Sequence, residues 1–222
     1  MGSIAMHLNI SKKIQERNNY SDDFLVGAVL PDIYKRTDLN RQDSHYLSPF
    51  GESPSSALLL PDLDKYVRDN LSSFDSDITK GYFAHLVQDY IWFRYYSSKF
   101  AKIVGKDDNS HELYTYSIEN HTKKHTLSEY HSQIYQDYSY WNKALLAQID
   151  VQAVKNGLKE FLNNPDCNAI IEQEFSYHGP AYDYVPFFIP EETLNRYTRA
   201  CILSFESEMK KIEMSHNISK KH

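Results

Sequence analysis

A histidine and an aspartate stand four residues apart within one predicted helix, in the sequence His85-Leu-Val-Gln-Asp89. Residues at this spacing project from the same helix face, so their side chains can hold one ion between them. The same spacing more often produces an ordinary side-chain hydrogen bond, and the pair alone does not predict a metal site. Its apolar surroundings make it more informative, because a carboxylate is rarely buried unless it is paired or coordinated.

Three further residues can complete such a site. Asp32 follows the most apolar run of the chain, residues 24–30, and therefore needs a partner as Asp89 does. His7 lies on the apolar face of a predicted helix, and His45 lies in an irregular segment before the long helix. Each histidine alone also fits a buried imidazole with a satisfied hydrogen bond. Together the five residues supply the nitrogen and oxygen donors that suit zinc, enough for two ions that share a carboxylate.

The composition predicts one globular domain built mainly of helices. The 222 residues are the size of one domain, and 41% are hydrophobic and 24% charged. Seven glycines and eight prolines are few for the many tight turns of a sandwich, a barrel or a doubly wound sheet. The net charge of −6, without a long block of Lys and Arg, argues against duplex nucleic acid as a partner.

The cysteines and the apolar segments bear on the compartment. Cys167 and Cys201 are too few for a disulfide framework or a cysteine zinc cluster, so we expect a reducing compartment. Residues 1–10 lack the basic and apolar stretches of a secretory signal, and no apolar run approaches the ~20 residues that span a bilayer. We therefore predict a cytoplasmic protein with no transmembrane segment.

The hydrophobic pattern divides the chain into helices and one long irregular connection over residues 34–61, a length at which loops are often functional. Pro31 is expected to end the second helix, which places Asp32 just beyond it. We expect one domain over residues 1–214 and a flexible tail over residues 215–222. The predicted helices cover residues 6–17, 24–30, 62–71, 77–104, 113–131, 134–146, 151–162 and 191–209.

Four motifs occur in order within about the first hundred residues. They are Met6-His7-Leu8, Gly27-Ala28-Val29-Leu30-Pro31-Asp32, Ser44-His45-Tyr46 and Gly81-Tyr82-Phe83-Ala84-His85-Leu86-Val87-Gln88-Asp89-Tyr90-Ile91-Trp92. Jointly they resemble the zinc-dependent phospholipase C family, and most closely its uncharacterised cytoplasmic branch. The resemblance implies an all-α fold, shared with the single-strand-specific zinc nucleases, in which a cluster of up to three zinc ions lies at the bottom of a cleft.

The resemblance distributes the five residues between two zinc ions. It implies that Asp32, His45, His85 and Asp89 hold one ion, and that Asp89 bridges to a second ion that His7 also binds. It further makes Asp32 the candidate catalytic proton acceptor. Secreted members complete the second site with the amino group of an N-terminal tryptophan. This chain begins with methionine and has its first histidine several residues in, so that ligand is missing.

The third zinc site of the family has an incomplete match. It uses a histidine shortly after the HxxxD pair and a later HxxxE pair. His125 and Glu129 match the later pair, but the positions shortly after Asp89 are aromatic. For His121, His125 and Glu129 a solvated, charged helix face is the alternative. Asp137 lies in an acidic aromatic motif of the cytoplasmic branch and is a further candidate for closing the site.

The expected chemistry is hydrolysis of a small or lipid-like phosphoric ester by a metal-activated water. Two ions about 3.5 to 4 Å apart lower the pKa of a shared water towards 7 and stabilise charge on the attacking and leaving oxygens. Lys35 and Arg36 are candidates for contacting the substrate's anionic group, with a solvated loop as the alternative. The aromatic segment 177–190 either covers the cleft or fills a space between helices.

Two other functions stay open. A hydrolase on the same metal core can act on amide or other non-phosphate bonds, because fold does not fix reaction. A non-catalytic helical binding module can use the metal for structure alone. The sequence has no GxSxG, GxxxxGK[ST] or GxGxxG motif, and it lacks the Glu-x-x-His pair of di-iron bundles. The oligomeric state is not predicted.

Overall fold

The structure is a computed structural model, and it describes residues 3–37, 39–50, 58–97, 102–106, 112–118, 121–176 and 184–219. Most of these residues are helical, as the composition predicts, and two small sheets are added. The α-helices are α1 (Ile4–Asn18), α2 (Asp23–Gly27), α3 (Leu30–Tyr34), α4 (Arg41–Ser44), α5 (Leu63–Asp69), α6 (Asp77–Ile91), α8 (Leu127–Leu146), α9 (Val151–Leu162), α10 (Cys167–Glu174) and α11 (Glu191–Ser219). Two short turns of other helix types are η1 (Leu71–Ser73) and η2 (Trp92–Ser97).

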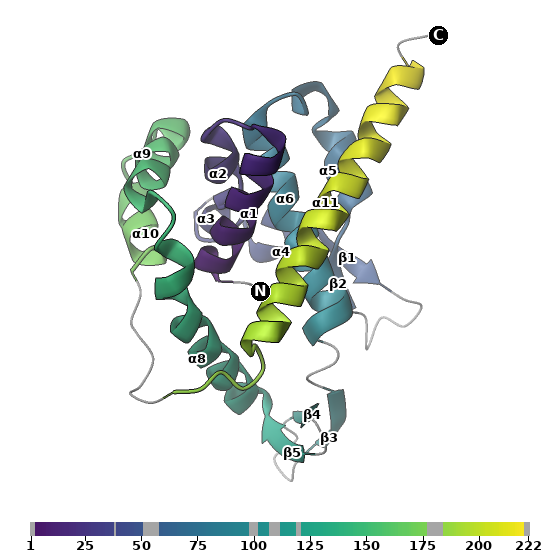
Figure 1. Cartoon of the computed structure of the whole chain (residues 1–222), viewed down its shortest axis with the longest axis vertical. Helices are drawn as coiled ribbons and strands as arrows, with labels where there is room; N and C mark the ends of the chain where they lie inside the picture. The colour runs from purple at the N-terminus through teal and green to yellow at the C-terminus, as the bar shows by residue number, and fades with distance from the viewer. Residues whose placement is uncertain are drawn as a thin grey trace.

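Helix α6 lies at the centre of the helical body, with α1, α2 and α11 packed against it (Figure 1). From Gly81 to Asp89 every residue of α6 is buried. A helix that is buried on all sides needs apolar residues around most of its circumference, which is why its polar members must find partners inside the protein. The two site candidates of the long helix, His85 and Asp89, belong to this buried stretch.

Helices α2 and α6 cross through a pair of glycines. A Cβ atom added to Gly27 would lie 2.0 Å from the carbonyl oxygen of Ile78, and one added to Gly81 would lie 2.0 Å from that of Phe24. Glycine is therefore required at both positions for the two backbones to approach this closely. The crossing brings the end of α2 against the middle of α6.

The prediction that Pro31 ends the second helix is wrong. Helix α2 already ends at Gly27, and Pro31 lies in the first turn of the next helix, α3. Proline is tolerated there because the first turn has no intrahelical partner for its missing N–H group. Asp32 is consequently part of the first turn of α3, where its backbone N–H donates to the carbonyl of Val29.

The irregular connection expected over residues 34–61 contains α4 and a hairpin. Strands β1 (Leu47–Phe50) and β2 (Leu58–Pro61) pair antiparallel, with Leu47 opposite Pro61. Tyr46, just before β1, adopts a left-handed backbone conformation with a φ of 51°. This conformation, uncommon for a bulky residue, turns the chain immediately after His45.

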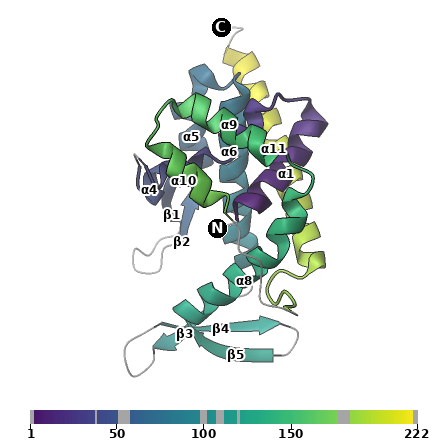
Figure 2. The same ribbon diagram turned by 90° about the vertical axis from the view of Figure 1, so that its left-hand side faces the viewer.

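A three-stranded antiparallel sheet replaces part of the predicted helices 77–104 and 113–131. Its strands are β3 (Lys102–Lys106), β4 (Glu112–Ile118) and β5 (His121–Thr126), in the order β3-β4-β5. The sequence of β4 is rich in tyrosine, threonine and isoleucine, which favour a pleated strand over a helix. The sheet lies at one end of the molecule, where α8 leads away from it (Figure 2).

Local capping signals explain where α8 begins. The Thr126 hydroxyl accepts from the backbone N–H of Glu129, and the Glu129 carboxylate accepts from the N–H of Thr126, which together form a capping box. Helix α8 therefore starts at Leu127 and runs through the break that the sequence placed before residue 134. The helices predicted over residues 6–17, 62–71 and 151–162 are confirmed as α1, α5 and α9 within a few residues.

Helix α11 continues to Ser219, past the position at which the sequence analysis placed the end of the domain. Residues 215–219 are therefore helical rather than part of a tail, and residues 220–222 lie outside the described residues. The last turns of α11 extend past the neighbouring helices (Figure 1). Among the described residues, no helix combines the length and apolar character needed to cross a membrane.

Candidate metal centre

The five predicted site residues converge inside the protein, although they come from four segments of the chain. His7 comes from α1, Asp32 from α3, His45 from the end of α4, and His85 and Asp89 from α6. All five are buried, with exposed fractions from 0% for His85 to 6% for Asp32. The structure thus brings together every residue of the predicted set.

His7 and His85 are fixed by hydrogen bonds through their Nδ1 atoms. The Nδ1 of His85 lies 2.8 Å from the carbonyl oxygen of Ala28, at the glycine crossing of α2 and α6. The Nδ1 of His7 lies 3.1 Å from Oε1 of Gln88. Both partners are acceptors, so each Nδ1 carries the proton and each Nε2 presents a lone pair.

His45 is held in the same way. Its Nδ1 lies 2.9 Å from the hydroxyl of Ser44, whose own proton is directed to the carbonyl of Arg41. The hydroxyl of Tyr82 donates to the backbone carbonyl of Ser44 and fixes this turn from α6. The His45 ring therefore also presents its Nε2 lone pair, which is the arrangement by which proteins orient histidine metal ligands.

The three Nε2 atoms face carboxylate oxygens at distances too long for hydrogen bonds. They lie 3.6 Å (His7), 3.9 Å (His45) and 4.0 Å (His85) from oxygens of Asp89, and that of His45 is 3.5 Å from Asp32. Among the described residues, the Nε2 of His85 has no hydrogen-bond partner. Lone pairs that face one another at this spacing are satisfied by a shared cation, since donors around a tetrahedral zinc lie about 3.4 Å apart.

Burial keeps the imidazoles of His7 and His85 neutral. It lowers the pKa of His7 below the ordinary value of 6.5 and that of His85 well below it. The two rings stack with centroids 3.8 Å apart, an arrangement that would place two positive charges in contact if both were protonated. Neutral imidazole is the form that binds metal ions, so the site holds its nitrogen ligands ready at neutral pH.

The two carboxylates are ionised in the same environment. Burial acts to raise the pKa of Asp32, but the close approach of His45, of His85 and of the Lys35 ammonium holds this pKa well below the usual range. For Asp89 burial also acts upward, and the imidazoles of His85, His7 and His45 are among the groups that bring its pKa below the ordinary value. The site therefore offers two ionised carboxylates beside the neutral imidazoles of His7 and His85, with His45 as a third nitrogen donor.

The donors form two overlapping groups of three. His7, Asp32 and His85 make up one group, and His45, His85 and Asp89 the other, each with ligand atoms within 4.8 Å of one another. His85 belongs to both, and it has one lone pair because its Nδ1 donates to the backbone. An ion bound to the Nε2 of His85 can therefore take its other ligands from either group. These buried residues can hold a metal ion. The first group places His7 with Asp32 and His85, whereas the resemblance associates His7 with Asp89 alone.

The cluster is closest to solvent at Asp32. The Asp32 side chain is 9% exposed, and the ammonium of Lys35, one turn later, contacts its Oδ1 and is 21% exposed. Arg36 turns instead to Glu174 at the end of α10 and forms an ion pair with it. Asp32 and Lys35 thus lie on the most exposed side of the cluster.

No protein-family model, curated protein or solved structure matches this chain. The interpretation therefore depends on the geometry of the five donors and on the residues that hold them.

Of the residues considered for a third metal, Glu129 has a described side chain, and it belongs to neither group of candidate ligands. His121 and His125 lie in strand β5, not on a helix with Glu129. The side chains of these two histidines lie outside the described part of the chain, whereas Glu129 caps α8. The helix face expected for the three residues is therefore wrong.

Asp137 has a structural role in place of the predicted one. Its carboxylate accepts from the backbone N–H groups of residues 187, 188 and 189 at 3.0, 2.6 and 2.7 Å and from the hydroxyl of Tyr184. Asp137 is fully buried and anchors the segment that precedes α11. Phe188 of that segment is buried against Tyr130, so the described part fills a space between helices. Residues 177–183 of the aromatic loop lie outside the described residues.

The sequence analysis did not identify the residues that orient the histidines. Gln88 bonds both His7 and, through its Nε2 at 3.0 Å, the hydroxyl of Ser11. Its position between His85 and Asp89 in a buried helix is a usable signal, because a buried amide requires partners. The roles of Ser44 and of the Ala28 carbonyl depend on tertiary contacts that the sequence does not display.

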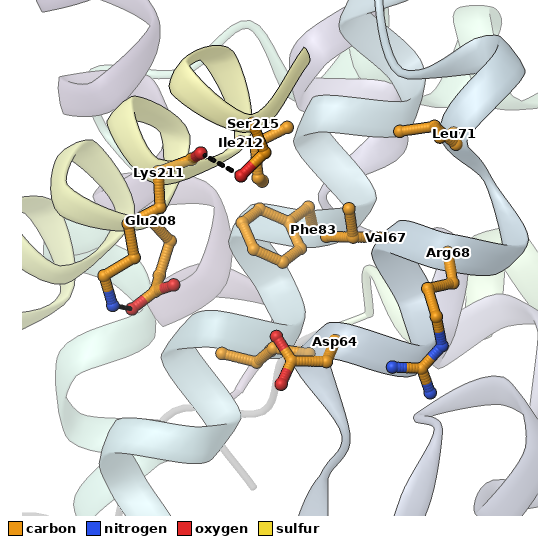
Figure 3. Close-up of a pocket in the computed structure, with 10 residues that line it drawn as sticks. Asp64, Val67, Arg68, Leu71, Phe83, Glu208, Lys211, Ile212 and Ser215 are labelled. Atoms are coloured by element: carbon orange, nitrogen blue, oxygen red, sulfur yellow. Dashed lines mark hydrogen bonds and ion pairs between the residues drawn. The ribbon is translucent and has the colours of Figure 1, made fainter. Parts of the chain in front are cut away.

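A separate groove lies between α5 and α11 (Figure 3). It has a volume of about 340 Å³, an apolar floor that includes Val67, Phe83 and Ile212, and a rim with Glu208 and Lys211. None of the five cluster residues is among those that line it. The groove offers apolar contact and is separate from the His/Asp cluster.

Proposed function

We propose that this chain is a zinc-dependent hydrolase that cleaves a phosphoric ester with a metal-activated water, on a fold of the zinc-dependent phospholipase C type. The observation that carries the proposal is the set of three Nε2 lone pairs directed at two ionised carboxylates inside the protein. The resemblance of the four sequence motifs supports the same assignment. Zinc is the metal proposed because it favours imidazole and carboxylate ligands at low coordination number.

A zinc ion bound to this cluster supplies Lewis acidity and lowers the pKa of a bound water to about 7. The chain's own residues then determine how substrate and water are held. The Nδ1 hydrogen bonds of His7, His45 and His85 fix the ring orientations, so the donors need little rearrangement when the ion binds. Such preorganisation is what a catalytic site requires of its ligands.

Asp32 is proposed to orient the attacking water. It is the most exposed of the five residues, so one carboxylate oxygen can accept a hydrogen bond from a water on the solvent side. The pKa of Asp32 is held well below its usual range, which makes it a poor store for a proton at neutral pH. Orientation of the water by an ionised Asp32 is therefore favoured over full proton transfer to it.

The test compares zinc-loaded protein with chelated protein on 4-nitrophenyl phosphate and bis(4-nitrophenyl) phosphate, with metal content measured by elemental analysis. Asp89→Asn is expected to lose bound zinc, because the new amide removes a charge from the centre of the cluster. Asp32→Asn is expected to reduce kcat by about 100-fold or more, the range for a residue that positions a proton in catalysis. His131→Asn, which removes an exposed histidine of α8, is the matched control and keeps both properties. Zinc-loaded wild type that cleaves neither ester contradicts the proposal.

A structural metal site is the second candidate, and the burial of the donors favours it. His45, His85 and Asp89 are at most 1% exposed, as the ligands of a closed site are. Structural zinc sites, however, are usually rich in cysteine, whereas this donor set contains only imidazole and carboxylate. Chelation separates the two functions. A catalytic site loses activity while the far-UV circular dichroism stays unchanged, and a structural site loses both together.

A further inference from the structure

Lys35, at the end of α3, is a cation in contact with the candidate metal centre. Its ammonium contacts Oδ1 of Asp32, while its side chain remains partly exposed to solvent. An ammonium has three N–H donors, so contact with one carboxylate oxygen leaves donors for a second acceptor on the solvent side. The neighbouring Arg36 is paired with Glu174, which makes Lys35 the cation of this turn that faces the cluster.

The charges of the cluster indicate that this ammonium can attract an anion. Asp32 and Asp89 are the two carboxylates of the five-residue cluster, and both belong to the groups of candidate metal ligands. One divalent ion therefore cancels the two carboxylates and leaves the centre without net charge. Lys35 then supplies a positive charge that attracts an anion to the side of the cluster on which Asp32 is partly exposed.

We propose that Lys35 is the anion-binding residue of this site and that its ammonium holds a terminal phosphoryl oxygen of the substrate. The inference rests on the proposed function and narrows it to substrates with a terminal phosphate, because a phosphomonoester dianion gains more from the added positive charge than a phosphodiester monoanion does. When an ion occupies the carboxylates, the same charge repels the ammonium from Asp32 and favours its contact with the substrate.

A purely structural role for Lys35 makes different predictions. If the ammonium serves only to neutralise Asp32, replacing it destabilises the metal-free protein and leaves anion binding unchanged. If it binds the substrate, its removal weakens anion binding and leaves zinc affinity equal to or tighter than that of wild type, because a competing positive charge is gone. The two roles therefore predict different changes in the affinities for phosphate and for zinc when Lys35 is replaced.

The experiment titrates inorganic phosphate into the zinc-loaded protein by calorimetry. Lys35→Met is expected to raise the Kd of phosphate by about 10- to 100-fold, the factor that corresponds to a hydrogen bond with a charged group. Lys35→Arg retains a cation and is expected to restore most of the affinity. Lys80→Met is the matched control, since Lys80 pairs with Asp77 at the same sequence spacing and is 18% exposed against 21% for Lys35.

Kinetics complete the test. In Lys35→Met, kcat/KM is expected to fall several times more for 4-nitrophenyl phosphate than for bis(4-nitrophenyl) phosphate. Phosphate binding that is equal in wild type and in Lys35→Met overturns the inference, as does an equal loss in Lys35→Met and Lys80→Met. If phosphate binds through Lys35 but neither ester is cleaved, the inference stands and the proposed function fails. If esters are cleaved and Lys35→Met is unaffected, the proposed function stands and the inference fails.

Discussion

Gly81→Ala tests whether the close crossing of α2 and α6 positions the candidate site. The added methyl group would lie 2.0 Å from the carbonyl oxygen of Phe24, a backbone atom that cannot rotate away. Ordinary contact between such atoms is about 3.5 Å, so α2 has to move from α6 by roughly 1 Å or more. The carbonyl of Ala28, one residue beyond α2, accepts the hydrogen bond of His85 Nδ1 at 2.8 Å. A shift of this size stretches that bond beyond hydrogen-bond range.

The expected cost follows from the two effects. Overpacking in a tight helix contact costs about 1 to 3 kcal/mol, and a buried donor that loses its acceptor costs about 1 to 3 kcal/mol. Alanine is more favourable than glycine within a helix by about 1 kcal/mol, which offsets part of this loss of stability. We expect the free energy of unfolding of Gly81→Ala to be about 1 to 5 kcal/mol lower than that of wild type. Zinc affinity is expected to fall about 10-fold or more, because the orientation of His85 is disturbed.

The measurements are urea unfolding in the presence of a chelator and zinc competition against a chromophoric chelator. Gly157→Ala in α9 is the matched control, since its added methyl would meet Cγ2 of Val26 at 2.6 Å, the movable end of a side chain. We expect its free energy of unfolding to stay within about 1 kcal/mol of wild type. The reasoning is refuted if Gly81→Ala is no less stable than Gly157→Ala, or if it binds zinc as tightly as wild type.

Three further predictions concern other parts of the structure. Asp137→Ala removes the acceptor for the backbone N–H groups of residues 187–189 and is expected to lower the free energy of unfolding by about 3 kcal/mol or more, measured with urea; a loss under about 1 kcal/mol contradicts the anchoring role. Without metal, burial lowers the pKa of His7 and His85 from 6.5, so the unfolded chain binds protons that the folded chain does not. Stability is then fully present above about pH 6.5 and declines as the pH falls, and a flat profile of urea midpoints between about pH 7 and pH 5 would count against neutral imidazoles. Gln88→Leu removes the acceptor of His7 Nδ1 and is expected to weaken zinc binding about 10- to 100-fold in the chelator competition, whereas unchanged affinity would show that Gln88 does not orient the ring.

The candidate residues could be predicted where the sequence signal is local, or where a buried polar side chain requires a partner. His85 and Asp89 share a helix face at a spacing that the sequence displays directly. Asp32 was found because a carboxylate beside an apolar run requires a partner. The convergence of all five residues depends on the packing of α1, α3, α4 and α6, which the order of the four motifs indicated and which periodicity alone does not specify.

The sheet region was not predictable from helical spacing. Residues 113–118 carry apolar and aromatic side chains that satisfy a helical pattern as well as an alternating one, and the pairing of β4 with β3 and β5 decides between them. Pro31 was misread for a related reason. Proline is compatible with both the end of one helix and the first turn of another, and the close packing of Gly27 on α6 ends α2 earlier.

The spread of the donors along the chain has a consequence for folding. An ion that joins His7 to Asp89 would act as a cross-link between distant positions, and it would restrict the unfolded chain over the whole N-terminal region as a disulfide does. Helices α8 to α11 lie outside this closed loop. They are attached by apolar packing and by polar contacts such as the Arg36–Glu174 ion pair and the hydrogen bond from the hydroxyl of Tyr197 to the carbonyl of Gln88. Metal supply would thus stabilise one part of the molecule directly and the other through the contacts between the two parts, such as those of α1 with α8, α2 with α9 and α6 with α11.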